Sequence, residues 1–157
     1  MRVAPCPVDP LRSRGSKLGA VAALVASLEP GVKTLVVGAW KPLLLETKET
    51  LQGVDVSAEL LEGPSNRRAA VLRRFREGAT TALLLLSHGG FEGHDLRAAS
   101  HVVFLHAFAE STDEALRIEH QVVGRVCRDS HDAYDVHVHH VVAADTNEER
   151  LWDTQHA

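Results

Sequence analysis

Short apolar runs alternate along the chain with longer segments in which apolar residues recur every three or four positions. Runs of the first kind, rich in leucine and valine, are typical of strands buried on both faces of a sheet, and segments of the second kind are typical of amphipathic helices. The runs predict strands at residues 33–37, 56–61, 80–86, 101–105 and 136–142. The periodic segments predict helices at residues 17–28, 40–51, 66–76, 112–128 and from Thr146 onward. This alternation predicts a three-layer α/β/α domain with a mainly parallel sheet.

Single residues at the segment borders support the assignment. Ser16 stands where an N-cap would open the first helix, and Gly78 stands where a left-handed residue would close the third. The run at 80–86 (TTALLLL) is apolar on both faces, which favours a central position in the sheet.

Length and charge narrow the class of protein. The chain has 157 residues and a net charge of −4, which predicts one domain and excludes a uniformly basic nucleic-acid-binding module. Residues 1–14 hold three prolines and three arginines and are expected to be a flexible lead-in or linker, so that the domain spans 15–157. The two cysteines, Cys6 and Cys127, form no disulfide pattern, and we expect an intracellular, reducing environment.

The pattern Gln-x-x-Gly-Arg-x-x-Arg, which runs from Gln121 through Arg125 to Arg128, is the strongest chemical signal. If the helix at 112–128 is continuous, these three side chains share one of its faces. Guanidinium groups keep their charge at any working pH and bind phosphate oxygens in a fork. The pattern therefore favours a polyphosphate ligand over a solvated basic face.

A glycine-rich turn at 87–96 follows the predicted central strand. In open α/β sheets, ligands bind beyond the carboxyl ends of the strands, and three glycines would let a ligand approach the backbone closely. Asp95 is a candidate for holding a ribose hydroxyl or orienting water, and Ser87 and His88 are candidates for ligand contacts. The alternative is that the glycines only form a tight turn.

The phosphate-binding loop that such arginines would complete is missing. No Gly-x-x-x-x-Gly-Lys-Ser/Thr sequence occurs, and no acidic pair follows a strand to hold magnesium. The residues thus predict half of a phosphoryl-transfer site. A serine hydrolase is not supported, because Ser87 lacks the Gly-x-Ser-x-Gly elbow. A metal site is not supported either: His137 and His139 share one strand face but have no nearby carboxylate or thiolate partner.

In the order of these motifs, residues 16–152 resemble the C-terminal RecA-like lobe of superfamily 2 helicases, and among them the SWI/SNF-type DNA-translocating ATPases. The segments that carry the resemblance are 16–18 (SKL), 33–40 (KTLVVGAW), Gly63 with Arg67, Arg68 and Phe75, 84–99 (motif V), 121–128 (motif VI) and 141–149 (VVAADTNEE). The chain departs from the family at Asp95, where relatives usually have asparagine, and after Arg128.

The resemblance implies roles for the nucleotide side of the domain. ATP and magnesium would be held mainly by an N-terminal RecA-like lobe that is absent here and would be supplied in cis or in trans. Arg128 would be the arginine finger and Arg125 its support, Gln121 would couple nucleotide to lobe closure, and Gly93 and Asp95 would line the near side. The isolated chain is expected to hydrolyse no ATP.

The resemblance also implies a nucleic-acid groove and a place in the cell. Trp40, Lys41, Ser87 and His88 would contact the backbone of nucleic acid, with duplex DNA as the expected substrate. No membrane partner is expected, and the SWI/SNF group implies a nuclear location. Two other functions stay open: a stand-alone, non-catalytic lobe that binds protein or DNA, and an unrelated Rossmann-like nucleotide-binding domain.

Overall fold

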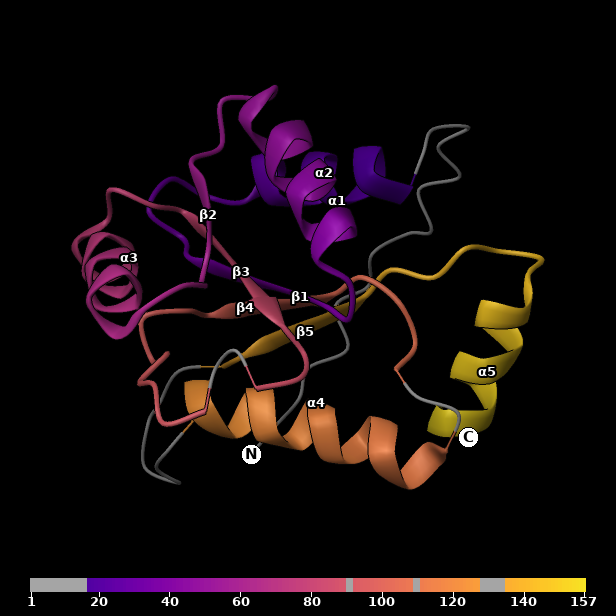
Figure 1. Cartoon of the computed structure of the whole chain (residues 1–157). Helices are drawn as coiled ribbons and strands as arrows, with labels where there is room; N and C mark the ends of the chain where they lie inside the picture. Colours follow the sequence, from indigo (N-terminus) through magenta and orange to yellow (C-terminus); the bar gives the residue numbers. More distant parts are fainter. Residues whose placement is uncertain (1–16, 90–91, 109–110, 128–134) are drawn as a thin grey trace.

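A computed structural model describes residues 17–89, 92–108, 111–127 and 135–157. Helices and strands alternate along it (Figure 1). In chain order they are α1 (Lys17–Ser27), β1 (Thr34–Gly38), α2 (Lys41–Gln52), β2 (Ala58–Leu60), α3 (Ser65–Glu77), β3 (Ala82–Leu86), β4 (His101–Phe104), α4 (Thr112–Val126), β5 (His137–His140) and α5 (Asn147–His156). The predicted lead-in at 1–14 and the predicted cap Ser16 lie outside the described residues.

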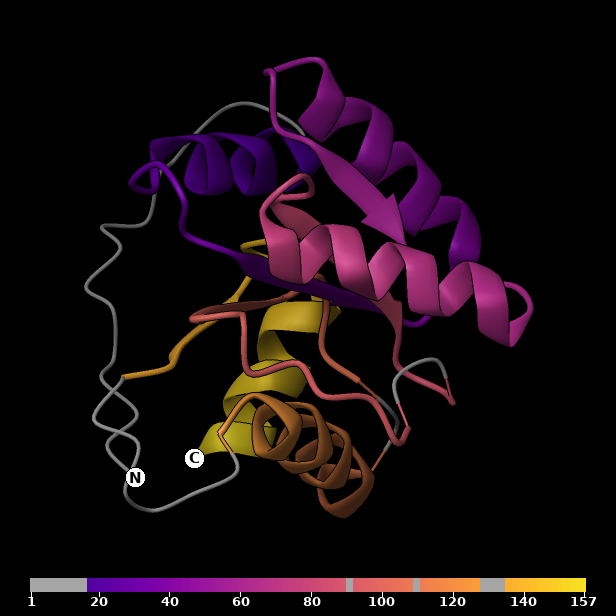
Figure 2. The same ribbon diagram turned by 90° about the vertical axis from the view of Figure 1, so that its left-hand side faces the viewer.

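The strands form one five-stranded sheet in the order β2-β3-β1-β4-β5, and every pairing in it is parallel. Helices α1 and α2 bury their apolar residues against one face of the sheet, and α3 and α4 bury theirs against the other. Figures 1 and 2 show the sheet between these two helical layers. The prediction of a three-layer α/β/α domain is therefore confirmed.

The two apolar cores explain which segments became helices and strands. All five residues of β1 are buried, because both faces of this central strand are covered. Helix α3 buries only Val71, Leu72 and Phe75, which recur at helical spacing on one face. Gly78 closes this helix with φ +90°, a left-handed conformation that suits glycine.

Predicted borders differ from the observed ones mainly where an apolar run continues past the paired part of a strand. The run at 136–142 contains a strand of only four residues, β5, and the run at 56–61 one of three, β2. The larger difference concerns the helix predicted at 112–128, which ends at Val126, since Cys127 has extended backbone (φ −109°, ψ 90°). Arg128 itself lies outside the described residues, so the prediction that Arg125 and Arg128 share one helical face is not tested.

The early end of α4 follows from its apolar stripe. Ile118, Val122 and Val126 are buried at intervals of four residues, and the next position in that series is Ser130. Without a further apolar side chain to bury, continuing the helix would gain little from packing.

None of the helices in the described ranges is long and apolar enough to cross a membrane.

Candidate functional site

The strand order has a switch point at the carboxyl ends of β1 and β4. From β1 the chain leaves toward the β2 edge through α2, and from β4 it leaves toward the β5 edge through α4, on the other face of the sheet. Open α/β sheets bind ligands at such a switch point, between the two outgoing connections, and we call this position the crevice. The residues that follow these two strands therefore define the first part of the site.

A stacked pair of rings, Trp40 and His106, occupies this position. Trp40 caps the start of α2 and is 62% exposed, whereas His106, which follows β4, is 7% exposed. Their ring centroids lie 4.7 Å apart. The backbone N–H of Ala39 donates to Nε2 of His106 (2.9 Å), and Nδ1–H of His106 donates to the carbonyl of Ala107 (3.0 Å). Both ring nitrogens are thus satisfied only by the neutral tautomer that carries its proton on Nδ1.

Burial lowers the pKa of His106 below its ordinary value and is the largest cause of the shift. The ring therefore stays neutral at neutral pH and keeps its acceptor for Ala39. The result is a fixed, uncharged support beneath one face of the indole. An exposed aromatic ring held in this way can stack on a nucleobase or on another planar group.

The other predicted groove residues lie at the same edge of the sheet. Lys41 begins α2 and forms an ion pair with Glu62 (2.7 Å), and His88 is exposed just beyond β3. Ser87 is buried (4% exposed), and its backbone N–H donates to the carbonyl of Gly38, so its side chain does not face solvent. The structure thus places Trp40, Lys41 and His88 at one edge of the sheet as surface candidates, whereas Ser87 at the same edge is buried.

A cationic cluster forms the second part of the site, on the α3–α4 face. His94 lies in the glycine-rich turn, and its pKa is lowered by burial and then by the positive charges of Arg68 on α3 and Arg125 on α4. The turn is tied to α4 because the N–H of Leu96 donates to the carbonyl of Arg125 (3.3 Å). We call Arg68, His94 and Arg125 the cationic cluster.

Two nitrogen atoms of the cationic cluster could each donate a hydrogen bond to an anion. Nε of Arg68 and Nε2 of His94 are buried, and neither has a hydrogen-bond partner within the described ranges. No described carboxylate forms an ion pair with either arginine. Buried polar atoms are normally paired, so a phosphate or carboxylate from a ligand or a second domain would fit here.

The remaining nucleotide-side predictions have mixed placements. Gly93 is exposed, has φ +78° and leaves open space beside its Cα, as close approach of a ligand requires. The carboxylate of Asp95 accepts from the backbone N–H and the guanidinium of Arg97 (2.7–3.1 Å), so it would have to share that partner with a ribose or water.

Gln121 lies one turn before Arg125 on the outer face of α4. It is exposed and lines a shallow depression of about 400 Å³. The other residues around this depression are Asp113, Leu116, Arg117 and His120. Arg128, the predicted arginine finger, lies outside the described residues.

Three residues of the site were not assigned a role by sequence reasoning. His106 supports Trp40, and Arg68 and His94 complete the cationic cluster. His94 and His106 follow strands β3 and β4 at the carboxyl edge, and that position was the available signal. Their partners come from other elements, which the sequence does not place.

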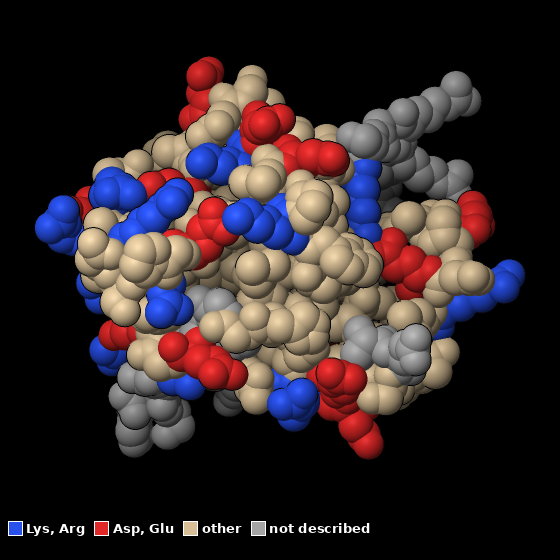
Figure 3. Space-filling model, in the orientation of Figure 1, with Lys and Arg blue, Asp and Glu red and all other residues tan. Residues whose placement is uncertain are grey.

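Charge is not concentrated on the face seen in Figure 3, where acidic and basic side chains are interspersed around a mainly uncharged centre. A broad basic surface that would attract nucleic acid from a distance is therefore not present on this face of the described residues. Recognition would depend on local contacts at the crevice.

The fold defines a class: an α/β/α lobe with an all-parallel sheet, whose candidate site residues lie mainly at the carboxyl edge of that sheet. The family profile described as "Helicase conserved C-terminal domain" matches residues 16–130. The chain belongs to this family. No curated protein matches the chain in sequence.

Solved structures agree on the fold. The C-terminal part of the Fun30 ATPase domain superposes with a TM-score of 0.74 at 18% identity, over 89% of this chain and 45% of that one. The C-terminal domain of the DEAD-box protein Dbp5 superposes with a TM-score of 0.68 at 19% identity, over 88% of this chain and 76% of that one. The Pyrococcus furiosus Hef helicase domain superposes with a TM-score of 0.68 at 18% identity, over 89% of this chain and 28% of that one. The chain thus has the RecA-like fold of helicase C-terminal lobes and spans less than half of the Fun30 and Hef chains.

Proposed function

We propose that the chain is the C-terminal lobe of an ATP-dependent helicase or DNA translocase, similar to the SWI/SNF group, and that it is inactive without a Walker A lobe. Lobes of this family usually pair with an N-terminal RecA-like lobe and bind nucleic acid. The proposal depends above all on one observation: the cationic cluster has buried donors with no described partner.

The residues present fit the phosphates of ATP and do not fit its magnesium ion. Arg68, His94 and Arg125 offer donors to an anion, whereas Asp95 in the glycine-rich turn beside them is already bound to Arg97. When bound between two lobes, ATP supplies the phosphoryl group that is transferred to water. Arg125 would neutralise charge on its oxygens, and the N-terminal lobe would hold the metal.

The role of Arg128 follows from the family motif. It is the last arginine of motif VI, three residues after Arg125. We propose that Arg128 is the arginine finger and that Arg125 and Gln121 hold the lobe against the nucleotide.

The crevice at β1 and β4 is proposed as the nucleic-acid contact. Trp40 offers an exposed ring on a fixed histidine support, and Lys41 and His88 add groups that can reach phosphates. Lys41 would exchange its ion pair with Glu62 for a phosphate, so binding should weaken as salt rises. Duplex DNA is the proposed ligand, in keeping with the resemblance of residues 141–149 to the SWI/SNF group.

ATP hydrolysis by the chain alone and with an N-terminal lobe tests this function. The isolated chain should hydrolyse no ATP, and the polypeptide that joins it to a Walker A lobe should hydrolyse ATP faster when duplex DNA is added. Trp40→Ala and Lys41→Ala should raise the DNA concentration for half-maximal stimulation, and Lys48→Ala, a lysine on α2 outside the crevice, should not. Hydrolysis by the isolated chain, or an equal response of all three variants, would contradict the proposal.

A further inference from the structure

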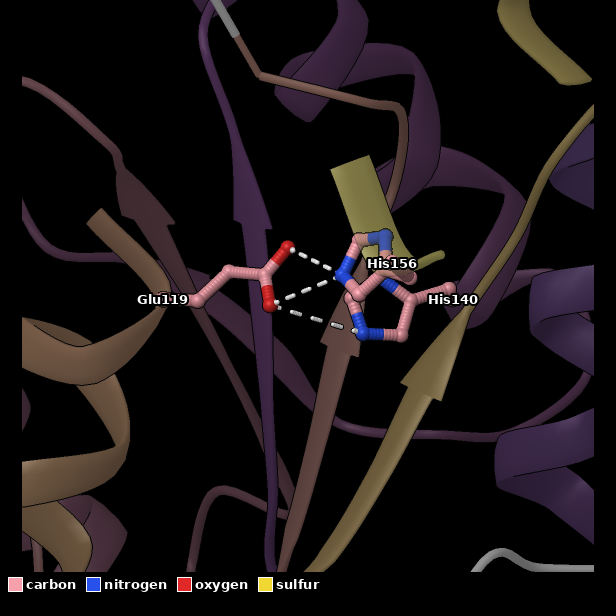
Figure 4. Close-up of side chains that lie close together, drawn as sticks. All are labelled: Glu119, His140 and His156. Carbon is pink, nitrogen blue, oxygen red and sulfur yellow. Dashed lines mark hydrogen bonds and ion pairs between the residues drawn. The ribbon is translucent and has the colours of Figure 1, made fainter. Parts of the chain in front are cut away.

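Three side chains from separate elements converge beside the β5 edge of the sheet. Glu119 comes from α4, His140 from the carboxyl end of β5, and His156 from the last turn of α5. One ligand atom from each lies within 4.8 Å of the other two (Figure 4). Two of the three residues lie beyond the family match at 16–130, so that match does not cover the cluster.

The hydrogen bonds of His156 leave a lone pair facing a carboxylate. Its Nδ1–H donates to the carbonyl of Trp152 one turn earlier (3.0 Å). In the neutral ring, Nε2 is then an acceptor, yet it lies 3.3 Å from both oxygens of Glu119. Two acceptors in contact need a proton or a cation between them. That is either a proton, carried by His156 or by Glu119, or a metal ion.

A single proton does not satisfy all three groups. Nε2 of His140 also points at Glu119 and lies 3.8 Å from its Oε2, which is beyond hydrogen-bond distance. The side chains of Glu119, His140 and His156 are only 13%, 17% and 20% exposed. Within the described ranges, no lysine or arginine pairs with Glu119. A largely buried carboxylate without a fixed cation is unfavourable.

One tetrahedral metal ion can take a ligand atom from all three groups, which lie within 4.8 Å of one another. With metal–ligand bonds of about 2.0–2.1 Å, neighbouring tetrahedral ligands lie about 3.3 Å apart. The contact between His156 and Glu119 already has this length, and that between His140 and Glu119 would shorten by about half an ångström. Two imidazoles and a carboxylate are a ligand set that zinc accepts, and the bond from His156 to a backbone carbonyl is the usual outer support of such a ligand.

The helix that carries His156 needs such an attachment. Of the ten residues of α5, only Gln155 is buried, so little apolar surface holds the helix to the lobe. Its described attachments are few: Nε2 of Gln155 donates to the carbonyl of Phe108, Glu148 pairs with Lys17, and the ring of Trp152 contacts that of His140. We infer that Glu119, His140 and His156 form a zinc site that fastens α5 to α4 and β5, with a fourth position open to water. This inference is independent of the proposed ATPase function.

Zinc titration of the metal-stripped chain, without a histidine tag, tests the site. In competition with a chromophoric chelator, the chain should bind one zinc ion. Glu119→Gln and His140→Gln should each weaken binding on the order of 100-fold or more, since even the loss of an outer-shell partner typically costs 10–100-fold. His137→Gln is the matched control, because His137 lies on the same strand as His140 and on its opposite face. Cobalt(II) in place of zinc should give the absorption bands of a four-coordinate ion.

Amide hydrogen exchange in α5 supplies a second readout. Zinc should slow exchange in α5 of the wild type and of His137→Gln, and should leave it unchanged in Glu119→Gln; circular dichroism shows that each variant is folded. No stoichiometric binding would show that the cluster is a protonated His156–Glu119 pair only, and would overturn the proposal. It would equally be overturned if His137→Gln lost zinc while Glu119→Gln retained it, or if bound zinc left exchange in α5 unchanged.

Discussion

Substitutions at His106 test whether the crevice between β1 and β4 is held in a fixed conformation. The ring has two roles that two substitutions can separate. His106→Phe keeps an aromatic ring against Trp40 and Phe108, whose centroids lie 4.7 and 4.5 Å away, but removes the acceptor for the Ala39 N–H. His106→Gln keeps an acceptor at about the position of Nε2 and removes the ring.

The size of each effect follows from these contacts. Leaving the partly buried Ala39 N–H without an acceptor should cost about 1–3 kcal/mol in unfolding free energy. Loss of the stacked contact should cost about 0.5–1.5 kcal/mol. His106→Phe should therefore be the more destabilising of the two, and Trp40→Ala, at a residue 62% exposed, should change stability by less than about 1 kcal/mol.

Urea denaturation at pH 7.5 and pH 5 measures the size of these free-energy changes and the direction in which they depend on pH. Burial lowers the pKa of His106 below its ordinary 6.5, so the neutral ring contributes stability that is present above pH 6.5 and is lost as the pH falls through the lowered pKa. His106→Phe has no such group. The stability difference between wild type and this variant should therefore shrink at pH 5.

A change below about 0.5 kcal/mol in His106→Phe at pH 7.5, with an unchanged m-value, would refute the reasoning. It would mean that the Ala39 N–H finds another acceptor. A larger loss in His106→Gln than in His106→Phe would show that stacking, and not the hydrogen bond, holds the crevice.

Three further predictions concern the fold. Phe75→Ala, at a side chain that is 1% exposed, should cost about 3–5 kcal/mol in urea denaturation, and a cost below 1 kcal/mol would place Phe75 outside the core. Hydrogen bonds from Arg74 hold the pKa of Glu59 below 4.5, so stability present above pH 4.5 is lost as the pH falls through the lowered pKa. Glu59→Gln should remove that part of the acid dependence, and an unchanged dependence of unfolding free energy on pH would contradict the prediction. Burial, and then the two histidines of β5 that face it, lower the pKa of His101 to about 4. Stability present above pH 6.5 is therefore lost as the pH falls toward 4, by about 1 kcal/mol at pH 5 after allowance for solvent screening. His101→Asn should flatten this loss, and urea denaturation at pH 7.5 and pH 5 measures it.

The sequence was sufficient for the order and type of the elements. Apolar runs and helical periodicity predicted five strands and five helices, because a parallel sheet covered on both faces needs uninterrupted apolar strands and one-sided helices. Borders were less well predicted, since pairing with neighbouring strands, and not apolar content, decides where a strand ends. Helix α4 shows the same limit: the motif continued to Arg128, but the buried stripe stopped at Val126.

Contacts between distant elements could not be predicted. Glu119 and His156 are 37 positions apart, and Ala39 and His106 are 67 apart, so no local spacing relates them. Sequence reasoning gave no metal site, because His137 and His139 lack a carboxylate on their face; the carboxylate that the structure supplies faces His140 instead. The fold had to bring α4 and α5 to the same edge before this cluster could be recognised.

The most direct test of the proposed ATPase role is the rate of DNA-stimulated ATP hydrolysis by the two-lobe polypeptide carrying Arg128→Ala. Loss of an arginine finger costs about 10³–10⁵ in rate, so turnover should fall by at least about a thousandfold. Arg117→Ala is the matched control, since Arg117 is exposed on α4 outside the cationic cluster, and it should hydrolyse ATP at nearly the wild-type rate. Hydrolysis that survives Arg128→Ala at the rate of the Arg117→Ala control would contradict the account.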